Sequence, residues 1–463
     1  MENKYKNSYN LLQNDLKNKI LMLDGAMGTM IQRENLTADD FGGEKYEGCN
    51  DYLVLQRPDI IKNIHKGYLE AGSDIIETNS FGALDIVLKD YDLEDKAFEM
   101  NKAAAELVNE AIAEYRSEHP EVTRNLYVAG ALGPSNKSIS VTGGVTFEEL
   151  IHSYYTAVSG LLAGGVDLIL FETIQDTRNL KAAYLGLKKA MEENYTVPLM
   201  LSFTIESTGT TLAGQTADAF YYAVNHMNPF SVGLNCATGP EFMTQFLKTL
   251  NNISNTYISV YPNAGLPNED GEYEETPDTL SAKIEPFFQN NYLNIVGGCC
   301  GTTPEHIQKI KEKSVNYSPR VIDESKDFND VSGLITLETP KNRPIYVGER
   351  TNVIGSRIFK NLIASEKFDE ATEVARLQIK GRADVIDICL ANPDRDEVAD
   401  MKAFLDKVAK FAKVPLMIDS TDINVIKEGL TYLQGKGIIN SINLEDGEKK
   451  FADMAKVIKD FGA

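Results

Sequence analysis

Short, nearly continuous apolar runs recur along the chain, and between them lie longer segments in which apolar residues return every three or four positions. Runs of the first kind are typical of parallel strands covered on both faces, and the second spacing is typical of amphipathic helices. Eight strand-then-helix units in about 300 residues predict a (β/α)8 barrel. The expected strands are 20–24, 74–78, 126–131, 167–172, 198–204, 231–236, 257–261 and 294–298, with helices such as 93–114, 154–163 and 241–250.

The rhythm breaks over residues 316–343, which are polar, charged and contain proline, and which are predicted to form a linker. Four more units follow, and four units amount to half a barrel, whose edge strands are left unpaired. We therefore predict a barrel over residues 1–315 and the N-terminal half of a second barrel, from a longer protein, over 344–463. A smaller, self-contained α/β fold is the alternative. The expected strands are 345–349, 385–390, 415–419 and 437–444, with helices over 366–380 and 397–411.

Charge and cysteine content limit the kinds of partner. The 463 residues carry 46 basic and 68 acidic side chains, a net charge of −22, which argues against nucleic acid or an anionic membrane as the main partner. Five unevenly spaced cysteines are too few for a disulfide framework, and no apolar run is long enough for a signal peptide core or a membrane span. These features predict a cytoplasmic protein, in which clustered thiols serve metal binding or catalysis.

Three of the five cysteines fall at predicted strand ends. Cys236 closes the sixth strand, and Cys299 with Cys300 follows the eighth strand inside the sequence GGCCG at 297–301. The carboxyl ends of barrel strands meet at one face, so the three thiols are expected to converge there as a zinc site with one open position. Two adjacent residues bind one metal only if the backbone bends sharply, and the flanking glycines are expected to supply that freedom.

Such a site suits sulfur chemistry. A zinc ion that already has three thiolates accepts a fourth thiol, and coordination removes the proton of that thiol near neutral pH. The bound sulfur is then able to attack an electrophilic carbon. The alternative is that the three cysteines pack as small hydrophobic residues. A closed structural zinc site would need a fourth ligand, and neither Cys49 nor any of the five histidines has matching spacing.

Four motifs stand at or near the predicted strand ends: LDGAMGT at 23–29, ETNSFG at 77–82, GLNC at 233–236 and GGCCGT at 297–302. Together they resemble the homocysteine-binding barrel of zinc-dependent homocysteine S-methyltransferases, over about residues 10–315. The resemblance implies that Cys236, Cys299 and Cys300 bind zinc and that zinc binds the homocysteine sulfur.

The same resemblance implies where the amino-acid end of homocysteine binds. Asp24 and Glu172 are the carboxylates expected to accept hydrogen bonds from its ammonium group, and the backbone amides of Gly25 and Ala26 are expected to meet its carboxylate. Asn235 is expected to support the zinc site or to replace a ligand transiently. The alternatives are a helix N-cap for Asp24 and a structural hydrogen bond for Glu172.

The sequence PIYVGERTNVIGSR at 344–357 resembles the opening of the pterin-binding barrel of cobalamin-dependent methionine synthases, and 384–387, 417–420 and 440–443 fit its next strands. The resemblance implies that a reduced pterin is bound by Asn352, Asp387, Asp419 and Asn443. Carboxylates accept hydrogen bonds from the N–H groups of the pterin ring, and amides suit its nitrogens and its carbonyl. The alternative is that Asp419 and Asn443 cap the helices that follow.

One position departs from that pattern. Relatives commonly carry asparagine two positions after the aspartate of the second strand, and here Asp387 is followed at that distance by Cys389. Asn392 is the candidate substitute, and core packing is the alternative role for Cys389.

These resemblances predict the substrate modules of a methionine synthase. Homocysteine, activated by zinc, is expected to receive a methyl group from methylcobalamin that another module or protein carries, and 5-methyltetrahydrofolate is expected to restore the methyl group. The first alternative is a homocysteine methylase that uses betaine or S-methylmethionine. Two others are a non-enzymatic zinc protein that docks a corrinoid and a methylase for another thiol.

Overall fold

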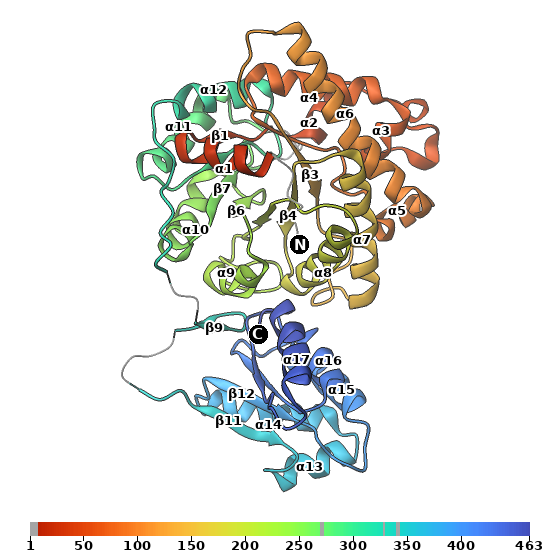
Figure 1. Ribbon diagram of the computed structural model, residues 1–463, viewed down its shortest axis with the longest axis vertical. Helices are drawn as coiled ribbons and strands as arrows, with labels where there is room; N and C mark the ends of the chain where they lie inside the picture. The colour runs from red at the N-terminus through yellow and green to blue at the C-terminus, as the bar shows by residue number, and fades with distance from the viewer. Residues whose placement is uncertain (1–7, 269–272, 327–328, 339–342) are drawn as a thin grey trace.

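The computed structural model describes residues 8–268, 273–326, 329–338 and 343–463, and it shows two α/β domains, one above the other (Figure 1). The upper domain contains an eight-stranded parallel sheet in the order β1-β8-β7-β6-β5-β4-β3-β2. A bridge between Leu23 and Ile75 brings the first strand beside the second and so nearly closes the sheet. The predicted (β/α)8 barrel is therefore confirmed.

The barrel strands are short and buried, and amphipathic helices surround them. The strands are β1 (Leu21–Met22), β2 (Ile75–Glu77), β3 (Tyr127–Leu132), β4 (Leu168–Ile174), β5 (Leu199–Phe203), β6 (Ser231–Asn235), β7 (Tyr257–Tyr261) and β8 (Ile295–Val296). The helices are α1 (Ser8–Asn18), α2 (Met27–Arg33), α3 (Leu53–Gln56), α4 (Pro58–Ala71), α5 (Asp85–Leu88), α6 (Ala97–Glu118), α7 (Phe147–Gly164), α8 (Thr177–Glu193), α9 (Ala217–Val224), α10 (Pro240–Ile253), α11 (Pro277–Gln289) and α12 (Pro304–Ser314).

Local sequence explains where these elements begin and end. All six residues of β3 are buried, as expected for a strand between the barrel interior and a helix layer. Helix α7 begins after Thr146, whose side chain forms a capping box with Glu149, and it ends at Gly165 in the left-handed conformation.

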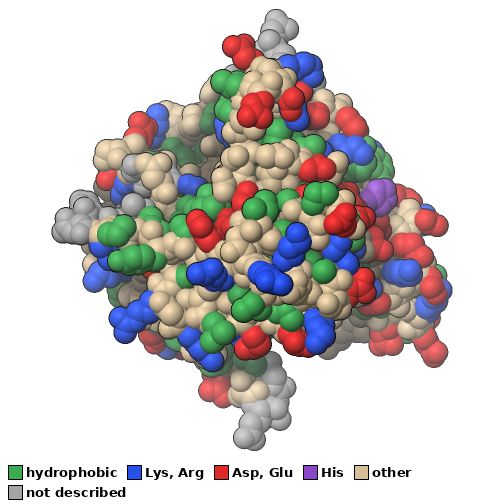
Figure 2. All heavy atoms as spheres, turned by 90° about the horizontal axis from the view of Figure 1, so that it is seen from below, with side chains coloured by type: hydrophobic (Ala, Val, Ile, Leu, Met, Phe, Trp, Pro, Cys, Tyr) green, Lys and Arg blue, Asp and Glu red, His purple; other side chains and the backbone are tan. Residues whose placement is uncertain are grey.

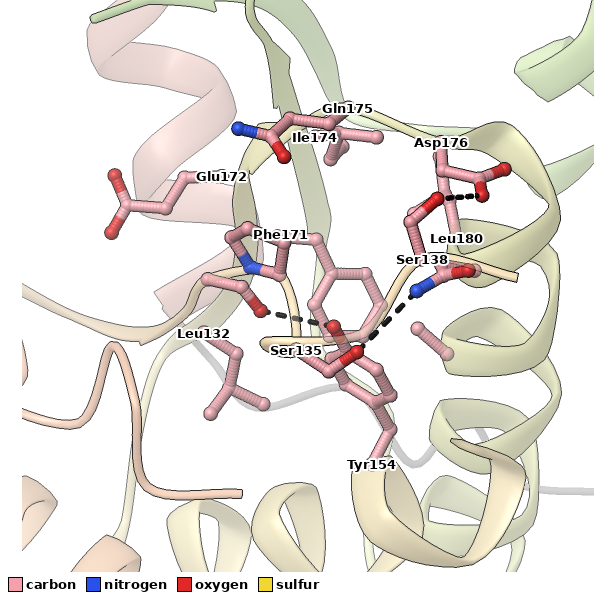
Figure 3. Close-up of a pocket in the computed structure, with 14 residues that line it drawn as sticks. Leu132, Ser135, Ser138, Tyr154, Phe171, Glu172, Ile174, Gln175, Asp176 and Leu180 are labelled. Carbon is pink, nitrogen blue, oxygen red and sulfur yellow. Dashed lines mark hydrogen bonds between the residues drawn. The ribbon is translucent and has the colours of Figure 1, made fainter. Parts of the chain in front are cut away.

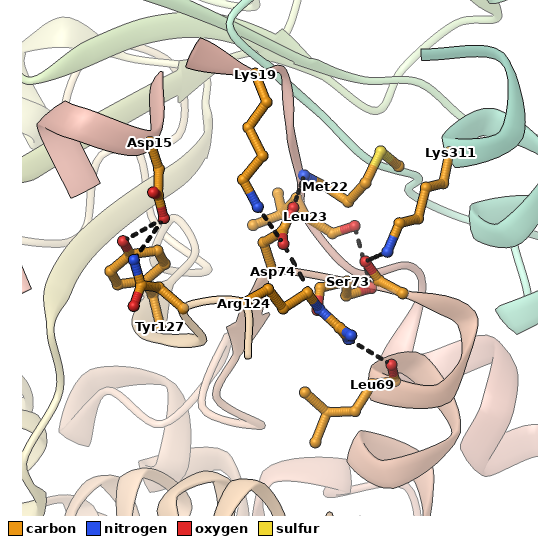
Figure 4. A network of polar contacts seen from close by, with 12 residues as sticks. Asp15, Lys19, Met22, Leu23, Leu69, Ser73, Asp74, Arg124, Tyr127 and Lys311 are labelled. Carbon is orange, nitrogen blue, oxygen red and sulfur yellow. Dashed lines mark hydrogen bonds and ion pairs between the residues drawn. The ribbon is translucent and has the colours of Figure 1, made fainter. Parts of the chain in front are cut away.

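A polar network holds the amino ends of the strands together (Figure 4). Asp74 accepts hydrogen bonds from the backbone N–H of Met22 at 3.0 Å and from Lys19 at 2.9 Å. Arg124 donates to the carbonyl of Leu69 at 2.7 Å, and Lys311 donates to the carbonyl of Gly72. These groups stabilise the end of the barrel that lies opposite the polar strand ends, where TIM barrels carry their chemistry.

The second domain contains a four-stranded parallel sheet in the order β11-β12-β13-β14. Its core is formed where helices pack on this sheet. The rings of Phe359 and Phe404 are in edge-to-face contact there, with their centroids 5.1 Å apart. The elements are β11 (Val347–Asn352), α13 (Arg357–Ala364), α14 (Phe368–Lys380), β12 (Val385–Cys389), α15 (Glu397–Val408), β13 (Leu416–Asp419), α16 (Ile423–Leu430), β14 (Ile438–Asn440) and α17 (Glu448–Asp460). This arrangement fits the predicted truncated barrel of the pterin-binding type.

Within the part of the chain that the structure describes, the first strand of this sheet pairs on one side only, with β12. Several apolar side chains near this strand in sequence are exposed, among them Tyr346 just before β11, Ile354 just after it and Ile358 in α13. On the face of the molecule seen from below, hydrophobic side chains lie among basic and acidic ones (Figure 2). The open edge is what an incomplete barrel predicts.

The segment predicted as a linker contains a small hairpin, β9 (Val331–Ser332) and β10 (Thr336–Leu337), that the sequence analysis did not predict. Its tip bonds to both domains: the carbonyl of Leu334 accepts from the backbone N–H of Thr216 at 2.9 Å, and its own N–H donates to the carbonyl of Lys413 at 3.0 Å. The hairpin therefore connects the barrel to the second domain. Across the described residues, none of the helices combines the length and hydrophobicity that a membrane span requires.

Candidate functional site

The three cysteines singled out from the sequence converge at the carboxyl end of the barrel. Cys236 follows β6 directly, and Cys299 with Cys300 lies in the loop after β8. Their sulfur atoms all lie within 4.8 Å of one another, and the Sγ atoms of Cys236 and Cys300 are 3.9 Å apart. Cys49 and Cys389, which are buried, are not part of this cluster.

The backbone conformation at the strand ends orients the three thiols toward one another. Cys236 has a φ of 54°, in the left-handed region, so the chain turns as soon as the strand ends. Gly301 has a φ of 79°, which a glycine adopts without strain. The expected freedom is therefore needed at Gly301 alone. Gly297 and Gly298 have ordinary φ values and are required for space, because a Cβ atom there would lie 2.8 Å from the carbonyl oxygen of Asp24 and 2.4 Å from Thr302 Oγ1, respectively.

The cluster fits a zinc ion. Tetrahedral coordination with Zn–S bonds of about 2.3 Å places ligand sulfurs about 3.8 Å apart, and the Cys236–Cys300 separation of 3.9 Å is close to that value. Hydrogen bonds from the Cys236 and Cys299 thiols hold the pKa of Cys300 well below its usual range. Within the described residues no histidine or carboxylate joins the group, which leaves a fourth position for another ligand.

A cavity of about 390 Å³ lies over the thiols, and four carboxyl groups line it: Asp24, Asp51, Glu77 and Glu172. Asp51 already accepts a hydrogen bond from the backbone N–H of Gly82 at 2.9 Å. Burial raises the pKa of Glu172 to about 8, and it raises the pKa values of Asp24 and Glu77 well above their usual range. Oδ1 of Asp24 and Oε1 of Glu77 are buried and have no hydrogen-bond partner among the described residues. Unpaired buried acceptors of this kind suit a cationic donor such as an ammonium group.

Sequence analysis placed Asp24 and Glu172 in the site but did not assign Glu77 to it. The signal was present, because Glu77 ends the second strand as Asp24 follows the first. Tyr261 and Tyr273 also line the cavity and were not predicted. Tyr261 is the last residue of β7, whereas Tyr273 belongs to the long connection after it, so only Tyr261 was open to prediction from strand ends.

The remaining predicted homocysteine contacts are placed differently. Gly25 and Ala26 line the cavity, but the N–H of Ala26 already donates to Thr302 Oγ1 at 3.2 Å. Asn235 is fully buried and lies behind the cavity wall. Its Oδ1 accepts from the backbone N–H of Thr173 at 3.0 Å, and its Nδ2 donates to Thr173 Oγ1 at 2.8 Å. The structure thus uses Asn235 to brace the end of β4.

In the second domain, three of the four predicted pterin residues lie together at strand ends. Asn352 Nδ2 is 3.2 Å from Asp387 Oδ2 and 3.4 Å from Asp419 Oδ2. Burial raises the pKa of Asp387 to about 6 and also raises that of Asp419. Oδ1 of Asp387 is buried without a partner among the described residues. The Asp387 carboxyl group is therefore free to accept a hydrogen bond from a ligand.

Asn443 is not part of that group. It is exposed, and its Oδ1 accepts from the backbone N–H of Glu445 at 3.0 Å, which makes it a turn residue. The side-chain oxygen of Asn392 likewise accepts a hydrogen bond from the backbone N–H of Asp394. Cys389 is buried at the end of β12, and its thiol hydrogen-bonds to Asp419, which offsets part of the rise that burial causes in the pKa of that carboxyl group.

Comparison with known proteins assigns the first domain to a protein family. Residues 21–314 match the family model described as homocysteine S-methyltransferase. The chain belongs to the homocysteine S-methyltransferase family. Residues 348–463 match the model described as pterin binding enzyme. The predicted pairing of a homocysteine S-methyltransferase domain with a pterin-binding domain is thereby confirmed, and the protein is a methyltransferase.

Solved structures agree with this assignment. The metallated form of the homocysteine methyltransferase MmuM from Escherichia coli is 25% identical, with a TM-score of 0.54 over 66% of this chain and 100% of that one. The oxidized form of the same enzyme is 23% identical, with a TM-score of 0.55 over 67% and 100%, and supports the fold. The thiol and carboxyl groups described above therefore belong to a homocysteine methyltransferase domain.

Proposed function

We propose that the protein methylates homocysteine with a methyl group from methylcobalamin, which another module or protein carries, and that 5-methyltetrahydrofolate at the second domain replenishes that donor. The observation that supports the first half is a single cavity lined by the three thiols and by the carboxyl groups of Asp24, Glu77 and Glu172. Homocysteine has a thiol at one end and an ammonium group at the other, so it complements both sets of groups.

The cysteines would hold the metal and the carboxyl groups would hold the substrate. Zinc bound by Cys236, Cys299 and Cys300 would supply a cation that favours the thiolate form of homocysteine. Asp24, Glu77 and Glu172 would accept the hydrogen bonds of the ammonium group. Holding both ends restricts the substrate sulfur to one orientation, which lowers the entropy lost on reaching the transition state. The S–CH3 bond forms as the bond from the methyl group to its donor breaks.

The second domain supports the choice of donor system. Asp387 and Asp419 present carboxyl oxygens beside Asn352 at strand ends, an arrangement of acceptors and an amide that suits a reduced pterin. Ligands of parallel α/β sheets bind at this end. A methyl-bearing pterin bound there would supply the methyl group. An enzyme that takes its methyl group from betaine or S-methylmethionine would have no need of such a domain.

The test is methyl transfer to homocysteine by the full chain loaded with zinc. Methylcobalamin, betaine and S-methylmethionine are each offered as donor, with and without a zinc chelator, and methionine yield is measured together with cobalamin absorbance. We expect methionine from methylcobalamin, loss of that activity with chelator, and recovery when zinc is restored. Methionine formed only from betaine or S-methylmethionine would overturn the donor assignment, and chelator-resistant transfer would overturn the role of the metal.

A further inference from the structure

Residues 172–176, which form the end of β4 and its connection to α8, line the homocysteine cavity at one end and reach the second domain at the other (Figure 3). At one end Glu172 lines the homocysteine cavity, and four residues later Asp176 is the N-cap of α8 and is only 3% exposed. In Figure 3 the side chains of Glu172 and Asp176 point in opposite directions. Five residues therefore join the substrate cavity to a buried carboxylate on its far side.

Glu172 depends on this backbone for its position. Its carboxyl group makes no hydrogen bond with any residue in the described ranges 8–268, 273–326, 329–338 and 343–463, so the backbone that carries it and the packing around it determine its position. The next residue, Thr173, has a φ of 54°, a strained conformation for a β-branched side chain that persists only where neighbours enforce it. Asn235 holds this end of the connection, through its two hydrogen bonds to Thr173.

Asp176 holds the other end, and it takes its hydrogen bonds from two domains. Its Oδ2 accepts from Ser138 Oγ at 2.6 Å and from the backbone N–H of Ser140 at 2.9 Å. Its Oδ1 accepts from Ser140 Oγ at 3.0 Å and from the N–H of Arg178 at 3.0 Å. The remaining donor is Gln434 Nε2 of the second domain, 2.8 Å from Oδ1, which also donates to Ser140 Oγ.

Gln434 is itself fixed. The segment that carries it, residues 431–435 after α16, lies against the first turns of α8. Lys181 of α8 donates to the carbonyls of Leu433 at 2.9 Å and Gly435 at 2.8 Å, on either side of Gln434. Arg178 donates to the carbonyl of Thr431 at 2.7 Å. The Gln434 amide therefore reaches Asp176 from a backbone that the barrel holds on both sides.

We infer that Gln434 is a positioning residue for homocysteine: from the second domain it holds Asp176, and through residues 172–176 it sets the position of the Glu172 carboxyl group. The inference rests on the role proposed above for Glu172. It makes the affinity of the first domain for its substrate depend on a side chain of the second. Small displacements of a group that positions a substrate are costly in binding and rate, because the bound geometry is tightly constrained.

The experiment measures homocysteine dissociation constants by calorimetry on the full chain loaded with zinc. Gln434→Ala removes the donor, and Gln434→Glu places a second carboxylate against Asp176. The matched control is Asp460→Asn, which removes an ion pair with Lys188 across the same interface but away from residues 172–176. We expect Gln434→Ala to raise the dissociation constant at least about fivefold, the lower range of coupling between sites, Gln434→Glu to raise it further, and the control to change it less than about twofold.

A double-variant cycle separates this inference from the function on which it rests. If Gln434 acts through Glu172, Gln434→Ala adds little once Glu172→Gln is present. Effects that add fully, or equal losses in Gln434→Ala and Asp460→Asn, would show general loosening of the interface and overturn the inference. The inference would also be overturned if Gln434→Ala bound homocysteine with unchanged affinity while Glu172→Gln bound it more weakly. Unchanged affinity in Glu172→Gln would instead refute the proposed role of Glu172. Zinc content and the unfolding temperature of each variant confirm that the folded site is compared.

Discussion

Oδ2 of Asp24 accepts a hydrogen bond of 3.0 Å from the backbone N–H of Glu77, so the ends of the first two barrel strands are joined by a group of the substrate cavity. The bond uses one oxygen of Asp24 and leaves the other, with Oε1 of Glu77, free of partners among the described residues. Because both carboxyl groups line the same cavity and interact electrostatically, both are candidates to accept hydrogen bonds from one ammonium group.

Glu77 should therefore matter for homocysteine as much as the carboxylates that the sequence singled out. Glu77→Gln keeps the shape of the side chain but removes one charged acceptor, and we expect the homocysteine dissociation constant to rise about tenfold, the value of one charge-assisted hydrogen bond. The measurement is calorimetric titration. Glu118→Gln, which removes a surface ion pair with Lys66, is the control and should bind normally. Equal affinities for Glu77→Gln and the control would remove Glu77 from the site.

The three clustered cysteines should each be needed for the metal. Replacing Cys236, Cys299 or Cys300 by serine removes one of three thiolates, and we expect zinc after dialysis to fall from one per chain to less than about a tenth, since affinity depends on ligand number and type. Mass spectrometry of the metal content measures this. Cys49→Ala, a buried cysteine outside the cluster, should retain its zinc. Full zinc occupancy in all three serine variants would refute the site.

Pterin binding should weaken in acid. Burial raises the pKa of Asp387 to about 6, from an ordinary value of 3.8, so the carboxyl group is an ionised acceptor above pH 6 and becomes protonated below it. If it accepts from the pterin ring, the dissociation constant of 5-methyltetrahydrofolate should rise by up to about tenfold for each pH unit below 6. Asp387→Asn should bind weakly and show no such dependence. A wild-type profile that is as flat as that of Asp387→Asn between pH 5 and pH 7 would contradict the contact.

The domain interface should gain stability as pH rises above neutrality. Burial, with repulsion from Arg178, lowers the pKa of Lys181 to about 7, and His226 also faces it with its pKa lowered to about 3. Between pH 7 and the unfolded pKa near 10.4 the unfolded chain binds more protons at this lysine, so raising the pH favours the folded form by up to about 1.4 kcal/mol per unit. Lys181→Met should lack this rise in urea unfolding from pH 7 to pH 9.5. Parallel curves for the two proteins would contradict it.

Much of the first site was predictable because barrel topology converts sequence position into spatial position. Strand ends meet at one face, so Cys236, Cys299 and Cys300 could be brought together without coordinates, whereas Asp24 and Glu172 came from the resemblance to homocysteine S-methyltransferases. Glu77 was open to the strand-end reasoning. The requirement for space at Gly297 and Gly298 was not, because it depends on the approach of Asp24 and Thr302 from distant segments.

Other features depend on contacts that leave no periodic signal. The bracing of Thr173 by Asn235 requires a left-handed residue at the end of β4, a conformation that threonine rarely adopts and that its sequence does not indicate. Gln434 lies 258 residues from Asp176, in a turn whose composition predicts only a turn. Asn443 was predicted as a ligand contact, but β14 ends at Asn440, and the chain has left the strand before it reaches Asn443.

The hairpin of β9 and β10 acts as a staple as well as a connection. Ser332 donates its backbone N–H to the carbonyl of Lys436, and Leu334 bonds to the backbone of both domains, so the hairpin is secured without help from the peptide bonds that precede it. A protease that cuts the chain between α12 and β9 would therefore yield two fragments that still migrate as one particle under native conditions. Their separation would require denaturant, and covalent continuity would be dispensable for holding the domains in register.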